Sequence, residues 1–402
     1  MQTFGAFIVS LIAAGGMVAA VPTESKTASV QATYNSKHIP HGPTALLKAY
    51  RKYGVPPSDQ LVTAAATKNV YKRQTGSVVT DPSDSFDSEY ITQVSIGSPG
   101  QSLPLDFDTG SSDLWVFSSE TPKAQAAGHK IWNIGQSKTA KELSGYSWSI
   151  LYGDHSSSSG NVYTDSVTVG GFTVKTQAVE SATKVSAQFT EDTSNSGLLG
   201  LAFDVDNTVK PVRQKTWFSN AQSSLKAPLF TANLKHQADG TYNFGFIDSS
   251  EFRGPINYVP VDNSQGFWGF TASGYSVNGK HISNSSISGI ADTGTTLLLL
   301  PDSIVSSYYS RVGSAKLNDQ LGGYVFSCSE RLPDFSFGVG SGSITIAGEL
   351  MNYAPADSAY TLCFGGLQSS SDIGINIFGD IALKAAVVVF DAGNHRLGWA
   401  QK

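Results

Sequence analysis

The chain has 402 residues and a formal net charge of −5 at pH 7, with 40% hydrophobic and 15% charged residues. This length exceeds a single ordinary hydrophobic core, so two lobes are expected. The 40 glycines, together with many Ser, Thr, Val and Tyr residues, favour β structure with tight turns and argue against a helical bundle.

The first 20 residues have the pattern of an export signal. Phe4 to Ala20 is apolar, small and uncharged, and it ends in Val18-Ala19-Ala20. The run is short for a membrane span and has a small-residue cleavage pattern, so residues 1–20 are predicted to be a signal peptide. No second apolar run of that length follows. We therefore expect a secreted protein with no membrane partner, and a vacuolar destination is the alternative.

Residues 21–73 differ in charge from everything that follows. They hold eight basic and two acidic residues, a net charge of +6, whereas the remaining chain holds 19 basic and 30 acidic residues, a net charge of −11. A basic leader is expected to dock on an acidic body at neutral pH and to detach as carboxylates protonate in acid. One amphipathic helix is predicted between Pro43 and Gly54, from the helical spacing of Leu46, Leu47, Tyr50 and Tyr53.

From Ser85 onward, short apolar runs alternate with turns rich in Gly, Ser, Asn and Asp, which predicts an all-β body. Two helices are expected within it, at Gln214–Leu225 and at Pro301–Val312. Four of the apolar runs are typical of strands: Tyr90–Ile96, Leu103–Phe107, Tyr146–Tyr152 and Val162–Val169.

The triplet Asp-Thr-Gly occurs twice, each time after apolar, strand-like residues. Asp108 begins the first copy and Asp292 begins the second, 184 residues later (292 − 108). Burying a lone carboxylate is costly, so each aspartate needs a partner. A turn explains one such triplet equally well, but two copies in matching apolar settings indicate a duplicated site.

A second repeat supports duplication. Gly200 follows Asp108 by 92 residues and Gly379 follows Asp292 by 87 residues, each directly after two apolar residues. We expect this later strand to pass beside the aspartate loop of its own lobe, with the glycine permitting close approach. Two such halves, residues 74–248 and 249–402, would bring the two aspartates together between the lobes.

These features resemble the pepsin-like aspartic proteases, in particular secreted fungal members such as penicillopepsin and aspergillopepsin. The resemblance covers the chain from about Ser85 onward. It implies a bilobal all-β fold with few short helices, a cleft between lobes related by a pseudo-twofold axis, and a secreted endopeptidase made as a zymogen. The segments that carry it are Asp108–Val116, Tyr152–Gly160, Leu198–Phe203, Asn263–Trp268, Gly289–Leu300 and Phe378–Asp380.

The resemblance implies that Asp108 and Asp292 are the catalytic dyad. Two carboxylates a few ångströms apart cannot both ionise easily, so one proton is shared. The ionised member takes a proton from water, the water attacks the scissile carbonyl, and the neutral member donates to the carbonyl oxygen. This chemistry needs no cofactor and no metal, and pepstatin is expected to inhibit it. The histidines show no ligand spacing that would suggest a metal site.

The resemblance also implies supporting roles for three matched pairs of residues. One pair would hydrogen-bond the carboxylates, one would brace the two loops against each other, and one would offer backbone N–H groups where a side chain would not fit. In that order, the pairs are Ser111 and Thr295, Thr109 and Thr293, and Gly110 and Gly294.

Residues 149–156 resemble the flap hairpin that closes over substrate. Tyr152 would cover the S1 side with its hydroxyl paired to the indole of Trp115, although a surface hairpin with an inward aromatic is the alternative. Asp154 and Ser156 match the fungal pattern that implies acceptance of Lys at P1 besides large hydrophobic residues at P1 and P1′. His155 departs from that pattern, since close relatives carry Gly at the tip, and we expect it to alter flap mobility or subsite preference.

Further contacts with substrate are expected from Gly153, Phe189, Leu198 and Thr296, and a core role is an equal alternative for Phe189 and Leu198. In a secreted protein the two cysteines, Cys328 and Cys363, are expected to form one bridge; two buried free thiols are the alternative. Asn284 begins an Asn-x-Ser sequon and is therefore a candidate for glycosylation.

The leader completes the interpretation. Lys72-Arg73 has the form of a processing site, so residues 21–73 are expected to be an inhibitory propeptide released by cleavage after Arg73. A disordered basic linker is the alternative. The expected partners are protein and peptide substrates and the protein's own propeptide, with no nucleic acid, and the protein is expected to be a monomer. A non-catalytic binding protein of the same fold is the rival function, disfavoured because both triplets and Tyr152 are present.

Overall fold

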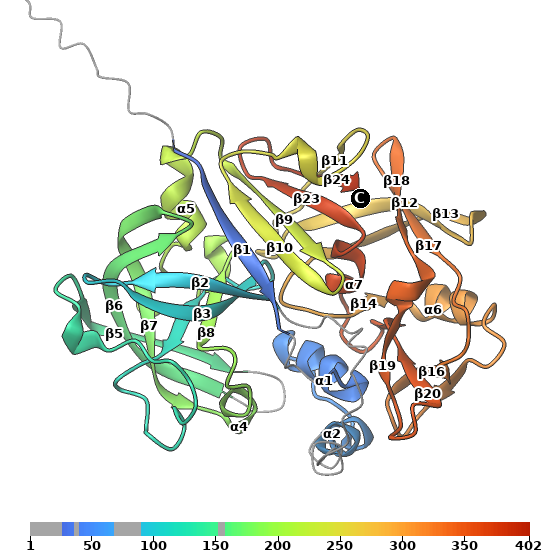
Figure 1. Cartoon of the computed structure of the whole chain (residues 1–402), viewed down its shortest axis with the longest axis horizontal. Coiled ribbons are helices and arrows are strands. Elements are labelled where there is room, and N and C mark those ends of the chain that lie inside the picture. The colour runs from blue at the N-terminus through green and yellow to red at the C-terminus, as the bar shows by residue number, and fades with distance from the viewer. Residues whose placement is uncertain (1–25, 36–39, 68–89, 152–156) are drawn as a thin grey trace, which may run out of the picture.

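The computed structural model describes residues 26–35, 40–67, 90–151 and 157–402. Within these ranges strands dominate and helices are short, which confirms the expected all-β class. Figure 1 shows the two expected lobes: strands of the first half of the chain (cyan to green) gather on one side and strands of the second half (orange to red) on the other. Two helices of the basic leader (blue) lie between the lobes at one end.

One large sheet connects the two halves. The three strands at one edge of this sheet come from residues after 250, and the next strands in spatial order come from residues before 250. In spatial order it consists of β11 (Asn257–Pro260), β24 (Arg396–Gln401), β23 (Ala386–Asp391), β9 (Leu229–Lys235), β10 (Ala238–Phe244), β1 (Ala28–Tyr34), β2 (Tyr90–Ile96), β3 (Gln101–Asp108), β8 (Gly197–Gly200), β4 (Leu114–Phe117), β7 (Phe172–Val185), β6 (Ser157–Val169) and β5 (Lys141–Leu151).

The second lobe is built on two smaller sheets. The first contains β18 (Gly342–Ile346), β17 (Phe335–Val339), β12 (Gly269–Val277), β13 (Lys280–Ala291), β22 (Ile377–Phe378), β14 (Leu298–Leu300) and β21 (Leu367–Ser369). The second contains β15 (Lys316–Asn318), β16 (Gly323–Ser327), β20 (Leu362–Gly365) and β19 (Asn352–Pro355).

The helices are short and lie at the ends of strands. The helix predicted at Gln214–Leu225 forms as α5 (Trp217–Ala221) followed by a 3₁₀ turn, and the one predicted at Pro301–Val312 forms as α6 (Asp302–Tyr309). No helix in the described part of the chain is long and apolar enough to cross a membrane. The others are α1 (Gly42–Lys52), α2 (Asp59–Ala66), α4 (Ala187–Thr190) and α7 (Asp380–Leu383).

The leader is more ordered than its sequence indicated. The predicted amphipathic helix is α1, and its apolar residues are buried. The prediction of one helix in the leader is incomplete, because the leader also forms α2 and the strand β1. β1 pairs antiparallel with β10 on one side and with β2 on the other. A central strand of this kind is held by its neighbours, which a reading of local sequence cannot show.

Aromatic packing ties the large sheet to the strand that leads into the second aspartate. Phe230 on β9 stacks on Phe390 of β23 with ring centroids 4.6 Å apart. Trp268 packs against both rings, and its indole Nε1 donates to the carbonyl of Leu201 across 2.9 Å. Trp268 directly precedes β12, which pairs with β13, so this contact helps to fix one half relative to the other.

The two cysteines are bridged. Cys328, just after β16, is bonded to Cys363 on β20, with a Cα–Cα distance of 4.9 Å. This confirms the predicted disulfide, and the alternative of two free thiols is wrong. The bridge joins two strands of the four-stranded sheet across 35 residues of sequence.

Replacing both cysteines by alanine should lower the free energy of unfolding by about 3–4 kcal/mol, because the reduced unfolded chain regains the freedom of a closed loop of this length. Urea titration of the full chain, followed by tryptophan fluorescence, measures the change. Cys328→Ala alone should destabilise to a similar degree, since either substitution opens the bridge. An unchanged urea midpoint in the double variant would contradict a stabilising role.

Candidate active site

Each Asp-Thr-Gly triplet lies at the end of a buried strand. β3 ends at Asp108, and Asp292 directly follows β13; their exposed fractions are 2% and 0%. β8 runs parallel to β3 and places Gly200 opposite Asp108, which confirms that the later strand passes beside the aspartate loop. A Cβ on Gly200 would lie 2.6 Å from the carbonyl oxygen of Ser111, so the close approach requires glycine.

The second lobe repeats this arrangement. β22 runs parallel to β13, with Phe378 opposite Ala291, and Gly379 follows immediately. A Cβ on Gly379 would lie 2.2 Å from the carbonyl oxygen of Thr295. The two glycines that follow paired apolar residues therefore play the same steric part in both lobes.

The two triplet loops are bonded to each other through their threonines. The backbone N–H of Thr109 donates to Thr293 Oγ1 across 3.1 Å, and the backbone N–H of Thr293 donates to Thr109 Oγ1 across 3.0 Å. Each hydroxyl in turn donates to a carbonyl of the opposite lobe, that of Thr109 to Ala291 and that of Thr293 to Phe107. This symmetric brace holds the two aspartates face to face.

The glycines of the triplets leave no space for a side chain. A Cβ on Gly110 would lie 2.5 Å from Asp292 Oδ1, and a Cβ on Gly294 would lie 2.3 Å from Asp108 Oδ1. Their backbone N–H groups donate to the carboxylates of their own triplets, Gly110 to Asp108 across 2.8 Å and Gly294 to Asp292 across 3.0 Å. The carboxylate of each lobe thus approaches the glycine of the other.

The two hydroxyls that follow the triplets behave differently. Ser111 Oγ donates to Asp108 Oδ2 across 2.6 Å. Thr295 Oγ1 is buried and has no partner at ordinary hydrogen-bond geometry among the described residues, yet a weaker hydrogen bond from this hydroxyl helps to lower the pKa of Asp292. Its support of that carboxylate therefore stays a prediction. The hydroxyl of Tyr53, from the leader, donates to Asp292 Oδ2 across 2.6 Å.

A lysine of the leader lies between the two aspartates. Lys52, the last residue of α1, places its Nζ 2.6 Å from Asp108 Oδ1 and 2.8 Å from both oxygens of Asp292. Figure 1 shows α1 (blue) between the two lobes. The Lys52 side chain is only 10% exposed, so the three charges face one another largely out of water.

Burial and these charges set the pKa values of the three groups. Burial works against the charge on Lys52, but the two carboxylates outweigh it and raise the pKa of Lys52. Burial also works against an ionised Asp292, yet Lys52 and the surrounding hydrogen bonds lower the pKa of Asp292. For Asp108, burial and the negative charge of Asp292 prevail over Lys52, so its pKa is raised.

Two further contacts anchor the leader. Lys48 Nζ lies 3.6 Å from Asp106 Oδ2, and the hydroxyl of Tyr50 donates to Asp372 Oδ2 across 2.8 Å. Sequence reasoning did not single out Lys48, Lys52 or these tyrosine hydroxyls as functional. The available signal was the four-residue spacing of the two lysines at the end of a predicted amphipathic helix, which places them on one face.

The predicted flap lies mostly outside the described residues. Tyr152, Gly153, Asp154 and Ser156 fall there, so the proposed pairing of Tyr152 with Trp115 stays a prediction. Trp115 itself is buried, and its Nε1 has no hydrogen-bond partner among the residues that the structure describes. Its ring packs against Trp148 at 6.0 Å and against Phe189 at 5.2 Å, and Leu198 lies opposite it in the sheet register.

The remaining predicted residues are scattered. Thr296 is 5% exposed, and its carbonyl accepts from the N–H of Ile381. Asn284 is exposed on β13. Arg73 lies outside the described residues. Among the residues that the structure describes, no group of three or more His, Cys, Asp or Glu side chains could hold a metal ion.

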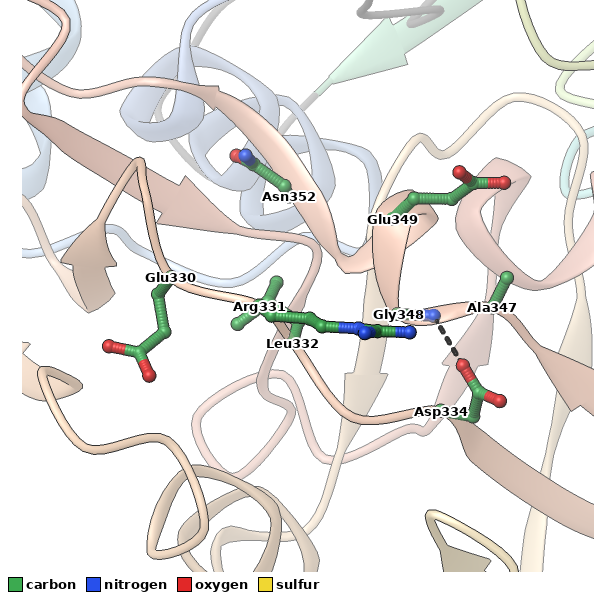
Figure 2. Close-up of a pocket in the computed structure, with 8 residues that line it drawn as sticks. All are labelled: Glu330, Arg331, Leu332, Asp334, Ala347, Gly348, Glu349 and Asn352. Atoms are coloured by element: carbon green, nitrogen blue, oxygen red, sulfur yellow. Dashed lines mark hydrogen bonds between the residues drawn. The ribbon is translucent and has the colours of Figure 1, made fainter.

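A hollow of about 390 Å³ in the second lobe contains none of the predicted site residues. Figure 2 shows its lining side chains, with Asp334 accepting from the N–H of Gly348 across 2.8 Å. Lys52 and Tyr53 contact the carboxylates of Asp108 and Asp292 directly, and neither of these residues lines the hollow. The lining residues are Glu330, Arg331, Leu332, Asp334, Ala347, Gly348, Glu349 and Asn352.

Known proteins match most of the chain. A family model described as eukaryotic aspartyl protease matches residues 89–402. The chain is 56% identical over 365 residues to endothiapepsin of Cryphonectria parasitica, covering 90% of this chain and 87% of that protein. It is 52% identical over 396 residues to aspergillopepsin-1 of Aspergillus oryzae, covering 98% of each.

A third relative matches over the full length. The chain is 49% identical over 410 residues to penicillopepsin-3 of Penicillium janthinellum, covering 100% of each. Two lobes, a duplicated aspartate loop bonded across the lobe boundary, and identities of this size lead to one conclusion. The chain belongs to the eukaryotic aspartyl protease family and is a pepsin-like aspartic endopeptidase of the fungal type.

Proposed function

We propose that the chain is the zymogen of an acid endopeptidase that hydrolyses peptide bonds with a water activated by Asp108 and Asp292. The observation that carries the proposal is the contact of one leader lysine with both carboxylates, 2.6 Å from Asp108 and 2.8 Å from Asp292. Because the ammonium group of Lys52 bonds both buried carboxylates, the leader covers the two proposed catalytic groups at this point.

Once Lys52 leaves, the two buried carboxyls face each other without a cation and share one proton. The ionised member can then take a proton from a water held between them. The water attacks the scissile carbonyl while the protonated member donates to the carbonyl oxygen, so that no cofactor takes part. The hydrogen bonds from Ser111 and from the N–H groups of Gly110 and Gly294 hold the carboxylates in place for both steps.

Asp108→Asn should lower kcat/KM for an acid-cleaved peptide by roughly 10²–10⁴-fold, because the amide cannot take part in proton transfer. The assay follows digestion at acid pH with and without pepstatin. Asp372→Asn serves as a control, because it changes an aspartate that bonds Tyr50 of the leader and lies outside the two triplets. Cleavage that resists pepstatin, or full activity of Asp108→Asn, would overturn the dyad mechanism.

The leader, residues 21–73, supplies the inhibition in this proposal. Lys52 lowers the pKa of Asp292, so the docked leader favours the ionised carboxylate. A group with a lowered pKa contributes stability above its ordinary pKa and loses it as pH falls, here from about pH 4 downward. The pKa of Lys52 is raised, so the lysine stays charged throughout. Acid therefore loosens the leader by protonating Asp292, the carboxylate whose pKa Lys52 lowers.

Lys52→Gln should open the dyad of the precursor near neutral pH, where the native leader still covers it. Pepstatin binding to the uncleaved precursor, measured by calorimetry, should strengthen by at least about tenfold, because a larger fraction of molecules is open. The control is Lys26→Gln, which removes an exposed leader charge away from the dyad. Equal pepstatin affinity for Lys52→Gln and the native precursor would refute inhibition by this lysine.

The substrate preference rests on the apolar groups around Trp115 and on the flap residues. Phe189 and Leu198 are partly exposed beside Trp115, which suits large hydrophobic residues at P1 and P1′. Tyr152 and Gly153 would cover the bound peptide, and Thr296, at the start of the second-lobe wall, would contact it. Asp154 and Ser156 would accept the ammonium group of a Lys at P1.

Asp154→Asn should reduce kcat/KM for a peptide with Lys at P1 by roughly tenfold, the size of one lost hydrogen bond to a charged group. The matched peptide with Phe at P1 is the internal control and should be affected far less. An equal loss for the two peptides would show that Asp154 does not read the P1 charge.

Several further parts belong to the same proposal. Residues 1–20 direct secretion, with a vacuolar destination as the alternative, and cleavage after Arg73 releases the mature chain. Residues 74–248 and 249–402 form the two lobes, Asn284 is the glycosylation candidate, and the enzyme acts as a monomer. Mass spectrometry of the secreted protein determines the N-terminus and the occupancy of Asn284 in one measurement.

A further inference from the structure

A second pair of carboxyl groups is buried close to the catalytic loop and has no part in the mechanism above. Asp113 lies five residues after Asp108, just before β4, and is 2% exposed. Glu180 lies on β7, opposite Trp115 in the sheet register, and is 1% exposed. Neither carboxyl has a lysine or arginine ion-pair partner among the described residues. Two acids buried together without a cation require another source of stability.

Hydrogen-bond donors surround one oxygen of each acid. Asp113 Oδ1 accepts from Asn207 Nδ2 across 2.9 Å and from both the N–H and the hydroxyl of Thr208, across 2.9 and 3.1 Å. The same Asn207 Nδ2 donates to Glu180 Oε1 across 3.0 Å. Glu180 Oε2 is buried and makes no hydrogen bond of ordinary geometry with another described residue, although the backbone N–H of Leu114 also acts on this carboxyl and works to lower its pKa. The arrangement supplies donors for the pair as a monoanion and leaves Oε2 as the oxygen that carries a proton toward Asp113.

The electrostatics agree with this reading. Burial raises the pKa of Glu180 well above its ordinary value, and the negative charge of Asp113 adds to the rise. Burial also raises the pKa of Asp113, against the bonds from Thr208 and Glu180. The other charged groups facing the pair are Asp108 and Asp206, both negative when ionised, while Arg213 acts on Asp206. These acids disfavour a second negative charge on the pair.

The pair is joined to the catalytic loop through its backbone. The carbonyl of Asp113 accepts from the N–H of Gly200 across 2.9 Å, and Asn207 Nδ2 also donates to the carbonyl of Ser112 across 3.2 Å. Ser111, the next residue back, bonds the carboxylate of Asp108. A change in the Asp113–Glu180 contact would therefore reach the residue that orients Asp108.

We propose that Asp113 and Glu180 are positioning residues that share one proton and that this proton holds the Asp108 loop in place. Loss of the proton would lower the stability of the enzyme as pH rises toward neutral. The inference rests on the proposed role of Asp108. When the proton is lost, two negative charges meet in a buried site between β4 and β7, and the loop that carries Ser111 and Asp108 loosens. The device is separate from the catalytic dyad, because it acts on the stability of the lobe.

The sign of the effect follows from the raised pKa of Glu180. A group whose pKa is higher in the folded state contributes stability that is complete below its ordinary pKa, about 4.3 for Glu, and is lost as pH rises toward the folded value. Within that window, one bound proton corresponds to about a tenfold rise in the unfolding equilibrium constant per pH unit. The native chain should therefore weaken as pH rises above about 4.3.

The test compares thermal and urea unfolding of the full chain from about pH 5 to about pH 8. The Asp108→Asn background prevents self-digestion. Glu180→Gln keeps the shape and hydrogen-bonding capacity of the side chain without an ionisable proton. It should reduce the pH dependence of the unfolding equilibrium constant by up to the contribution of one titrating proton. In the active chain, it should lengthen the half-life for inactivation near neutral pH by roughly tenfold, the equilibrium factor for one pH unit.

The matched control is Glu120→Gln, which changes another carboxyl of the same lobe. Among the described residues, Glu120 accepts from Asn161, Tyr163 and Ser181 and shares no contact with a second carboxyl, so its replacement should leave the pH dependence assigned to the Asp113–Glu180 pair in place. A pH dependence in Glu180→Gln that equals the native one, or an equal flattening in Glu120→Gln, would overturn the proposal. These readouts do not depend on catalysis, so they stand apart from any failure of the dyad assignment.

A second variant covers the case in which Glu180→Gln does not fold. Asp113→Asn gives Glu180 a neutral partner and should likewise flatten the pH dependence. If both variants fail to fold, infrared spectroscopy of the Asp108→Asn chain decides. A protonated carboxyl band that persists near neutral pH, well above the ordinary range of Glu, and disappears at higher pH supports the shared proton. Absence of that band overturns it.

Discussion

The fold depends on solving one electrostatic problem, the burial of Asp108 and Asp292 within reach of each other. Each carboxylate is bonded by the glycine N–H of its own triplet, and each triplet glycine makes room for the carboxylate of the other lobe. The threonine brace then fixes the separation of the two loops. The charge that remains is met by Lys52 of the leader, a residue that comes from α1 and lies outside both triplet loops.

The leader is built into the architecture and is not merely attached to it. β1 lies between β10 and β2 within the large sheet, and α1 carries Lys48 and Lys52 to Asp106 and Asp108. Two lysines four residues apart on a helix are spaced by about 6 Å along its axis. Two aspartates two residues apart on a strand are spaced by nearly the same length. This match explains how one helix end can satisfy two acids of one strand.

Much of the site was predictable from local pattern. Asp108, Asp292 and the paired glycines Gly200 and Gly379 stand in repeated settings, and repetition at matching intervals indicates a duplicated site. The bonds from Lys52 and Tyr53 to Asp292 could not be predicted in this way. They come from residues 240 and 239 positions away in sequence, and such contacts leave no local sign.

By itself, the amino-acid sequence determined the all-β class, the duplication, the identity of the two aspartates and the opposite charges of leader and body. These properties are periodic or compositional, and neighbouring residues suffice to state them. Only the tertiary structure decided that Lys52 meets both aspartates and that Asp113 and Glu180 share a buried site. Both contacts join segments far apart in sequence, and their energies come from burial and from distances of about 3 Å, the range of a hydrogen bond, which exist only after the chain has folded.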